Sequence, residues 1–265
     1  MISECIEKTD DYDICRTKRA VPHQMPSTHY HDHYEIYYLV KGEIRYFIGN
    51  MTFDLKAGDM VLIPPGVIHK TASAADNSME RILLIFTDNF LLKDPGDKIF
   101  DCFGRYYIEN AGALEKLLIA IESEHYSKDK YSFDIIRCYI ETLLIRLSRI
   151  VSDTVAEKPV QSEFQKIANY ITENYASEIT LEKLSQMYSI SKSHLSRQFK
   201  LTTGFGLNEY ITLVRIKNAE RLILNTSYPI TDIATMCGFN DSSYFSVVFK
   251  KIKGISPLKL RLSNF

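Results

Sequence analysis

Apolar and polar positions follow two different periods along the chain. Between about residue 17 and residue 88, short apolar runs alternate with turn signals that contain glycine or proline. After residue 110, apolar residues recur at intervals of three and four, which is the spacing of one helix face. This change of period predicts a β-rich first part and a helical second part.

The strand-like runs of the first part are short and closely spaced. They cover residues 34–40, 43–48, 51–55, 60–63 and 80–86, and turns with glycine or proline separate the first four. Strands of this kind are typical of a small antiparallel barrel or sandwich. We therefore expect an antiparallel β-barrel in the N-terminal half.

Two helices are predicted after these strands, over residues 111–124 and 132–151. The second helix carries a broad apolar stripe. A stripe this wide can pack on the barrel, and part of it can also pair with the same stripe of a second subunit, so we expect both contacts. The stripe consists of Ile135, Ile136, Tyr139, Ile140, Leu143, Leu144, Leu147 and Ile150.

A polar stretch with a proline, residues 152–161, interrupts the helical pattern and is typical of a linker. It predicts one domain over residues 1–151 and a second, all-helical domain over residues 162–265. A helix over residues 162–176 opens the second domain. The fold class that follows is α+β, with two domains.

Residues 229–257 are typical of two short helices that meet at a tight turn. The first helix has apolar residues on one face, and Gly238 then supplies the backbone freedom that a tight turn needs. The second helix also repeats its apolar residues at helical spacing and keeps its other side polar. Such a pair is either a helix-turn-helix, whose second helix enters the major groove of DNA, or an ordinary helical hairpin.

The same apolar skeleton occurs once more upstream. Leu181, Leu184 and Ser185 precede Ile230, Ile233 and Ala234 by 49 positions, and Leu195, Phe199, Lys200 and Gly204 precede Phe245, Phe249, Lys250 and Gly254 by 50. The second copy therefore has one extra residue in its turn. A plain bundle has no reason to repeat a hairpin, so the repeat favours two DNA-binding units.

The stretch of residues 206–226 between the two copies predicts a long helix that covers most of it. Its length of about 18 residues corresponds to about 27 Å. This approaches the rise of one DNA turn, about 34–36 Å. The two recognition helices could therefore enter successive segments of the major groove on one face of the duplex.

Four short motifs in this half lie at residues 233–239, 243–245, 249–251 and 254–257. With them, residues from about 162 to 263 resemble the DNA-binding domain of the AraC family of transcription regulators. The resemblance implies one-component regulation. In this scheme a sensor domain binds a small molecule, and a double helix-turn-helix binds promoter DNA, often as a dimer.

A histidine-rich run over residues 29–35 leads into the first strand-like run. Because side chains alternate across a strand, His29, His31, His33 and Glu35 are expected on one face. Further residues at characteristic spacings are Gly42, Gly58, Pro64, Gly66 and His69. Together these residues resemble the cupin signature, and the first half is similar to the cupin-like sensor that many AraC regulators carry.

The chain departs from the cupin signature at two positions. Only Tyr34 separates His33 from Glu35, where cupin metal sites usually leave three or four residues, and Ser73 replaces the expected asparagine after His69. The shortened spacing argues against the metal site that the resemblance would imply.

Three uses of these side chains stay open. One is a divalent transition metal held by imidazole and carboxylate ligands. The use we expect is a pocket for a small polar, sugar-like molecule, with no cofactor. The third is that the histidines cap strand ends or face solvent, above all His29. The metal ligands would be His31, His33, Glu35 and His69, and the pocket residues His31, His33, Glu35, Tyr37, Tyr46 and His69.

Charge is distributed unevenly, although 32 basic and 33 acidic side chains leave a net charge of only −1. Residues 1–158 carry 19 Lys and Arg against 25 Asp and Glu, or −6, and residues 159–265 carry 13 against 8, or +5. A basic second half suits a polyanionic partner.

The sequence also indicates the compartment. No apolar run of about 20 residues could span a membrane, and the N-terminal stretch lacks the continuous apolar segment of a signal peptide. The cysteines, five in number, are scattered without CxxC spacing, so we expect reduced thiols. A cytoplasmic protein with no membrane partner is predicted.

In the first recognition helix, Leu195 and Phe199 are predicted core residues, which leaves a polar face for DNA. Arg197 is the predicted base reader, because its guanidinium can donate two hydrogen bonds to guanine O6 and N7. Lys200 is expected to bind phosphate. The full predicted face is Lys192, Ser193, Ser196, Arg197 and Lys200.

In the second recognition helix, Val247 stands at the position equivalent to Arg197, where the family often has arginine. Valine can touch a thymine methyl group but donates no hydrogen bond. We therefore expect the first helix to dominate base readout and the second mainly to secure the backbone. The predicted contacts of the second helix are Asp241, Ser242, Ser243, Ser246, Val247 and Lys250.

These features predict a sequence-specific transcription regulator, not an enzyme, that binds promoter double-stranded DNA and a small-molecule effector as a homodimer. Two rivals stay open. One is a metal-dependent cupin enzyme with an accessory helical domain. The other is a DNA-binding protein whose barrel only assembles subunits.

Overall fold

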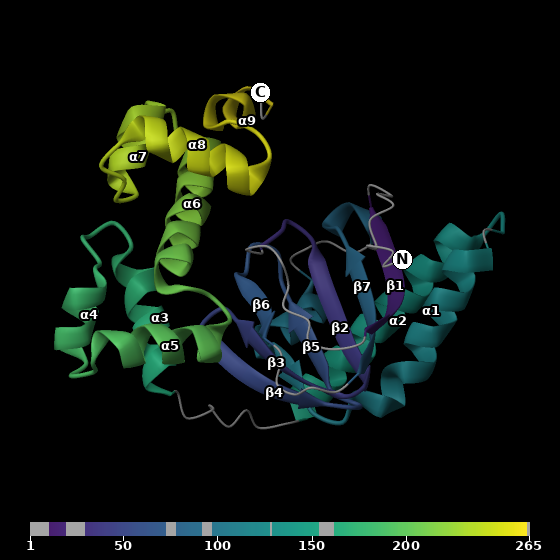
Figure 1. The fold of residues 1–265 in the computed structure, drawn as a ribbon. Coiled ribbons are helices and arrows are strands. Elements are labelled where there is room, and N and C mark those ends of the chain that lie inside the picture. The colour runs from purple at the N-terminus through teal and green to yellow at the C-terminus, as the bar shows by residue number, and fades with distance from the viewer. Residues whose placement is uncertain are drawn as a thin grey trace. The chain divides into compact units, whose positions relative to one another are not determined.

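The computed structural model describes residues 11–19, 30–72, 78–91, 97–127, 129–153 and 162–263. Contacts within the chain divide these residues into two compact units, one up to residue 153 and one from residue 162 (Figure 1). Among the described residues, no helix combines the length and the apolar character needed to cross a bilayer.

The N-terminal unit contains two antiparallel sheets (Figure 1). The five-stranded sheet has the order β1-β7-β2-β5-β8, with β1 Tyr12–Arg19, β7 Met79–Phe86, β2 Tyr34–Lys41, β5 Met60–Ile63 and β8 Tyr107–Ile108. The three-stranded sheet has the order β4-β3-β6, with β4 Met51–Lys56, β3 Glu43–Ile48 and β6 His69–Ala72. The register places Glu35 opposite Ile63 and Ile85 on the two neighbours of β2.

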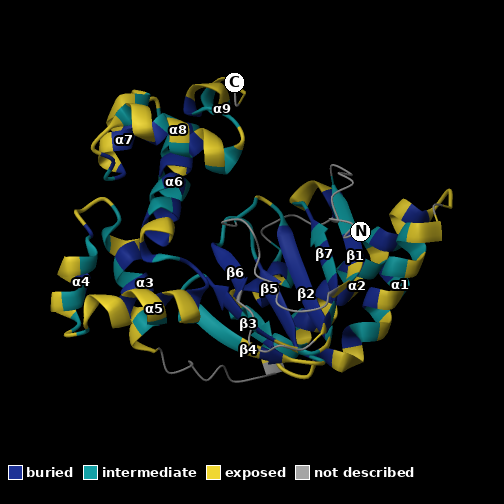
Figure 2. Ribbon diagram, in the orientation of Figure 1, coloured by how far each residue is buried: buried dark blue, intermediate teal, exposed yellow. Residues whose placement is uncertain are grey.

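Both faces of the five-stranded sheet are covered, so β2 and β5 are buried along most of their length (Figure 2). Alternate side chains of β2 point to opposite faces. Tyr37 and Leu39 belong to the apolar core between the two sheets. Ile36 and Tyr38 belong to a second core, which includes the helices that follow the barrel. A buried polar side chain at an odd-numbered position of β2 therefore lies inside the barrel.

Helical segments follow the last long strand. They are the 3₁₀ helices η1 Asp88–Phe90, η2 Lys98–Arg105 and η3 Ala111–Leu114, then α1 Glu115–Ser127 and α2 Ser132–Asp153. The helix predicted over 111–124 thus begins as a 3₁₀ turn, which is common at helix N-termini. The middle of the apolar stripe on α2 is fully buried within its own unit, at Ile136, Ile140, Leu143, Leu144 and Leu147. Packing within its own unit, in a core shared with α1, η2 and the five-stranded sheet, therefore accounts for most of the stripe.

The second unit is entirely helical in its described part. It contains α3 Glu163–Asn174, α4 Leu181–Met187, α5 Lys192–Thr203, α6 Leu207–Asn225, α7 Ile230–Met236, α8 Ser242–Lys253 and α9 Pro257–Leu262. Ser162 caps α3 through a capping box with Gln165. The long helix α6 lies between the α4–α5 pair and the α7–α8 pair (Figure 1).

The two pairs repeat one another as the sequence predicts. α4 and α7 both have 7 residues, and α5 and α8 both have 12. α5 and α8 each end at a glycine in the left-handed conformation, Gly204 and Gly254. The turn between α4 and α5 spans residues 188–191, and that between α7 and α8 spans 237–241, so the extra residue lies in the second turn.

The predicted α+β class, with an antiparallel barrel and a double helix-turn-helix domain, is confirmed. Strands β1, β6 and β8 were not predicted. Of the predicted linker, residues 152 and 153 continue α2, and the rest lies outside the described residues. The expectation that all cysteines are reduced is wrong for Cys15, which is in a disulfide, whereas Cys102, Cys138 and Cys237 are free.

Candidate functional site

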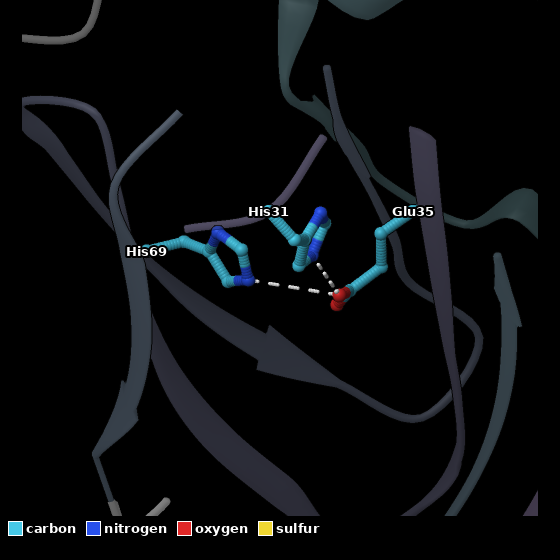
Figure 3. Close-up of side chains that lie close together, drawn as sticks. All are labelled: His31, Glu35 and His69. Carbon is cyan, nitrogen blue, oxygen red and sulfur yellow. Dashed lines mark hydrogen bonds and ion pairs between the residues drawn. The ribbon is translucent and has the colours of Figure 1, made fainter. Parts of the chain in front are cut away.

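A cluster of polar side chains lies inside the barrel (Figure 3). Glu35, near the start of β2, is only 2% exposed. His31 precedes β2, and His69 is the first residue of β6 and is fully buried. His31, Glu35 and His69 form, within the described part of the chain, the one group of three side chains that could hold a metal ion. The sequence-predicted residues His31, Glu35 and His69 are thus brought together.

The carboxylate of Glu35 is the centre of this cluster. His31 Nε2 lies 3.0 Å from Glu35 Oε2, and His69 Nε2 lies 3.6 Å from the same oxygen. Tyr46 on β3 donates its hydroxyl proton to Glu35 Oε1 over 2.9 Å. Burial favours the neutral acid, but hydrogen bonds from His31 and His69 and their charge outweigh it, so the pKa of Glu35 lies well below its ordinary value. Glu35 is therefore a buried carboxylate.

The other ring nitrogen of each histidine determines the tautomer. His31 Nδ1 lies 3.0 Å from the carbonyl oxygen of His33, and His69 Nδ1 lies 2.8 Å from that of Val67. A carbonyl oxygen can only accept, so both Nδ1 atoms carry a proton. In the neutral tautomer, each Nε2 would then present a lone pair to the Glu35 carboxylate. These lone pairs and the carboxylate oxygens would repel each other. A second proton on each histidine, or a cation bound between the Nε2 atoms and the carboxylate, would remove this repulsion.

The remaining predicted barrel residues lie beside the cluster. The ring of His33 stacks on that of His31 with 3.7 Å between centroids, so its side chain supports His31 and is not one of the three possible ligands. Tyr37 packs edge-on against Tyr46, with 5.2 Å between the ring centroids. His29 lies outside the described residues, as does Ser73.

Sequence reasoning missed two polar side chains of the barrel interior. Arg81 on β7 pairs with Leu39, and its guanidinium carbon lies 5.2 Å from the ring centroid of Tyr37. Thr71 on β6 pairs with Tyr46. Arg81 Nε and Thr71 Oγ1 are buried and have no hydrogen-bond partner within the described structure. The available signal was an arginine within the apolar run 80–86, but only the register of β7 places it inside.

The candidate DNA-binding surface begins with α5. Leu195 and Phe199 are fully buried, as predicted, and turn the opposite side of the helix to solvent. Ser191 caps the helix by accepting from the backbone N–H of His194. The predicted contacts on this exposed side are Lys192, Ser193, Ser196, Arg197 and Lys200. Lys192 also forms an ion pair with Glu182 of α4 at 2.5 Å, which neutralises part of its charge.

The second recognition helix, α8, has the same buried side, with Phe245 and Phe249 in its core. Unlike those of α5, some of its predicted DNA contacts make hydrogen bonds within the helix. The Asp241 carboxylate caps the helix by accepting from the backbone N–H groups of Ser243 and Tyr244 at 2.7 and 3.1 Å. Ser246 donates to the carbonyl oxygen of Ser242 over 2.9 Å. The polar groups of Asp241 and Ser246 are thus already committed to the helix itself.

The exposed centre of α8 is mainly apolar. Val247 is 68% exposed, and Tyr244, one helical turn earlier, is 57% exposed. Ser243 and Lys250 are exposed on either side of this pair along the helix. Tyr244 was not among the contacts predicted from the sequence, although its spacing of three residues from Val247 places the two on one face. α8 therefore offers apolar contacts where α5 offers an arginine.

Comparison with known proteins covers both units. A family model described as an AraC-like ligand binding domain matches residues 12–93, and one described as a helix-turn-helix domain matches residues 184–263. The chain is 26% identical over 252 residues to the HTH-type transcriptional activator RhaR of Escherichia coli, which covers 92% of this chain and 89% of that relative. RhaR of Shigella dysenteriae matches to the same extent.

Solved structures show weaker similarity. Unsaturated fatty acid bound wild-type ToxT of Vibrio cholerae is 17% identical, with 97% of each chain covered and a TM-score of 0.42. The C-terminal domain of AraT, a response regulator from Geobacillus stearothermophilus, is 30% identical, covering 40% of this chain and 88% of that domain, with a TM-score of 0.38.

Proposed function

Since the chain belongs to the AraC family of DNA-binding transcription regulators, with an N-terminal ligand-binding domain, we propose that a small polar molecule bound inside the barrel controls how α5 and α8 bind promoter DNA. The relatives are transcriptional activators, so the chain is a regulator. On this proposal the barrel binds its ligand without converting it, and the protein acts in the cytoplasm, where the DNA is.

The polar interior of the barrel is the observation that carries this proposal. A buried donor without a partner costs about 1–3 kcal/mol. Arg81 Nε and Thr71 Oγ1 are such atoms, and they share the barrel interior with the Glu35 cluster. A ligand that brings its own oxygen atoms would satisfy both. Hydroxyl groups of a sugar, or the carboxylate of a sugar acid, have this chemistry.

A thermal-shift screen of the full chain against neutral sugars and sugar acids tests the barrel as a sensor. A true ligand should stabilise the folded chain by about 2.7 kcal/mol at one hundred times its Kd. The Arg81→Met variant keeps the side-chain bulk but should lose most of that gain. The matched control is Arg45→Met, because Arg45 lies on the outside of β3 in an ion pair with Asp54.

The two ligand classes are distinguished by the same screen. If only sugar acids stabilise the chain and Arg81→Met abolishes the effect, the ligand is an anion. If Arg81→Met retains the whole ligand-induced gain, the barrel interior around Arg81 is not the binding site.

A divalent transition metal is a second candidate ligand, which the histidine tautomers favour. One possible ligand atom from each of His31, Glu35 and His69 lies within 4.8 Å of the other two. Metal-bound histidines commonly donate their other N–H to a backbone carbonyl, as both histidines do here. Two imidazoles and a carboxylate fit zinc or a non-haem iron centre. A bound metal would hold the three side chains together. The rival function, a metal-dependent enzyme, requires such a metal.

Elemental analysis after incubation with Zn²⁺, Ni²⁺ or Mn²⁺ and gel filtration tests this candidate. If a metal is the ligand, about one ion per chain should remain bound to the wild type and to His33→Ala, whose ring only stacks on His31. The same ion should be lost in His69→Ala, because His69 is one of the three possible ligands. A wild-type chain that retains no metal would exclude the metal and with it the rival enzyme, and would leave the small-molecule proposal standing.

We also propose a homodimer formed by the N-terminal unit. Packing on the barrel leaves two isoleucines of the helices partly in solvent, Ile119 of α1 and Ile145 of α2. A self-complementary contact through these helices would bury them. Sedimentation velocity of the full chain would detect the dimer, and a monomer at all concentrations would exclude it.

A further inference from the structure

The two helix-turn-helix turns differ in what surrounds them. Each has one residue in the left-handed region at the equivalent position, Ser189 with φ 54° and Gly238 with φ 81°. Ser189 is exposed. At Gly238, an added Cβ would lie 2.9 Å from the carbonyl oxygen of Tyr175 and 3.0 Å from that of Ala176. The second turn therefore packs directly on the chain that follows α3, and only a glycine allows this approach.

Arg215 of α6 lies at the same junction. Its Nε donates to the carbonyl oxygen of Tyr175 and its Nη2 to that of Ser177, each over 2.9 Å. Its guanidinium carbon lies 5.8 Å from the ring centroid of Phe239, which follows Gly238 in the second turn. One side chain thus holds the α3–α4 connection with two hydrogen bonds and contacts the α7–α8 turn with its face.

A second link fixes α8 to the same long helix. Glu220 of α6 forms an ion pair with Lys253, in the last turn of α8, at 2.6 Å, and both side chains are largely buried. Arg215 and Glu220 lie five positions apart on α6. Arg215 contacts the turn before α8, and Glu220 contacts the C-terminal end of α8. α8 is therefore held at both ends relative to α6.

We propose that Arg215 and Gly238 form a rigid joint between the two helix-turn-helix units, and that this joint sets the spacing at which α5 and α8 read DNA. The inference rests on the proposal that both helices contact DNA. Arg215 is a positioning residue on this view, because its donors are engaged with backbone carbonyls of the chain itself. A rigid joint lets the second unit bind without a further entropic cost once the first is bound.

The experiment compares DNA spacing preferences. The probe is a DNA duplex that the full wild-type chain selects from a pool of random sequences. Each duplex in the pool is about 30 base pairs long, which leaves room for two binding segments one helical turn apart. Footprinting locates the two segments, and one or two base pairs are then inserted between them. The wild type should bind the inserted duplexes about tenfold or more weakly. Arg215→Ala should bind the selected duplex about tenfold more weakly but lose most of this insertion penalty, to about threefold or less.

Matched variants separate the joint from general damage. Arg221→Ala removes an exposed arginine from the same helix, and Ser189→Ala changes the equivalent position of the first turn, so both should keep the wild-type insertion penalty. Gly238→Ala should behave like Arg215→Ala. Arg215→Lys, with one ammonium group for two carbonyls, should lie between Arg215→Ala and the wild type. General destabilisation would weaken binding to all duplexes and leave their ratio unchanged.

Two results would overturn the inference and have different meanings. If the wild type shows the insertion penalty and Arg215→Ala retains it in full, the joint does not set the spacing. If the wild type protects a single segment and tolerates insertions, only one of the two recognition helices contacts DNA, and the proposal that both do fails as well.

Discussion

Replacing Glu35 with alanine should lower the free energy of unfolding of the N-terminal unit by about 3–5 kcal/mol, the usual cost of removing one partner from a buried charged group. The buried carboxylate accepts from Tyr46 and lies 3.0 Å from His31 Nε2 and 3.6 Å from His69 Nε2. Without it, three polar side chains would face a cavity. The loss should therefore exceed that expected for removal of a surface glutamate.

Urea unfolding followed by circular dichroism is a suitable measurement, because the chain contains no tryptophan. Glu43→Ala is the control, since Glu43 lies exposed on β3 of the three-stranded sheet and its loss should change stability by less than about 0.5 kcal/mol. If Glu35→Ala and Glu43→Ala have equal effects, the buried carboxylate does not stabilise the barrel.

Replacing Arg197 with alanine should remove about 1–3 kcal/mol of discrimination at one base pair of the DNA site, the worth of a bidentate contact to guanine. Arg197 is exposed on α5, opposite the buried Leu195 and Phe199. α8 has no equivalent donor, because Val247 occupies that position. Binding to single-base variants of a selected duplex measures the effect directly.

Lys200→Ala provides the contrast to Arg197→Ala. A phosphate contact carries no base information, so this variant should weaken binding to all sequences alike and reduce the salt dependence by about one unit of slope. Ser243→Ala tests the second helix. If Arg197→Ala leaves base preference intact while Ser243→Ala abolishes it, the assignment of readout to α5 is wrong.

Asp241 was predicted to contact DNA, and the structure shows that its side chain caps α8. Its position at the start of a recognition helix suggested a DNA reader. The structure places its carboxylate on the first backbone N–H groups of α8, where it satisfies donors that the helix leaves open. A capping role also avoids setting a bare negative charge against phosphate.

Two of the barrel strands, β1 and β8, could not be predicted from the sequence. β1 has the sequence YDICRTKR, in which polar residues outnumber apolar ones, and it is a strand because all eight of its residues pair with β7. β8 consists of two residues that pair with β5. Neither segment contains enough periodic signal to predict a strand, because the partner strand supplies the hydrogen bonds that stabilise it.

By itself, the sequence determined the two-domain class, the barrel followed by helices, and the duplicated helix-turn-helix with its extra turn residue. These follow from period, spacing and repetition, which are properties of neighbouring residues. The tertiary structure decided which histidines meet Glu35, that Arg81 and Thr71 face the same interior, and that Gly238 packs on the end of α3. These depend on strand register and on contacts between distant segments, and such contacts leave no periodic trace along a single chain.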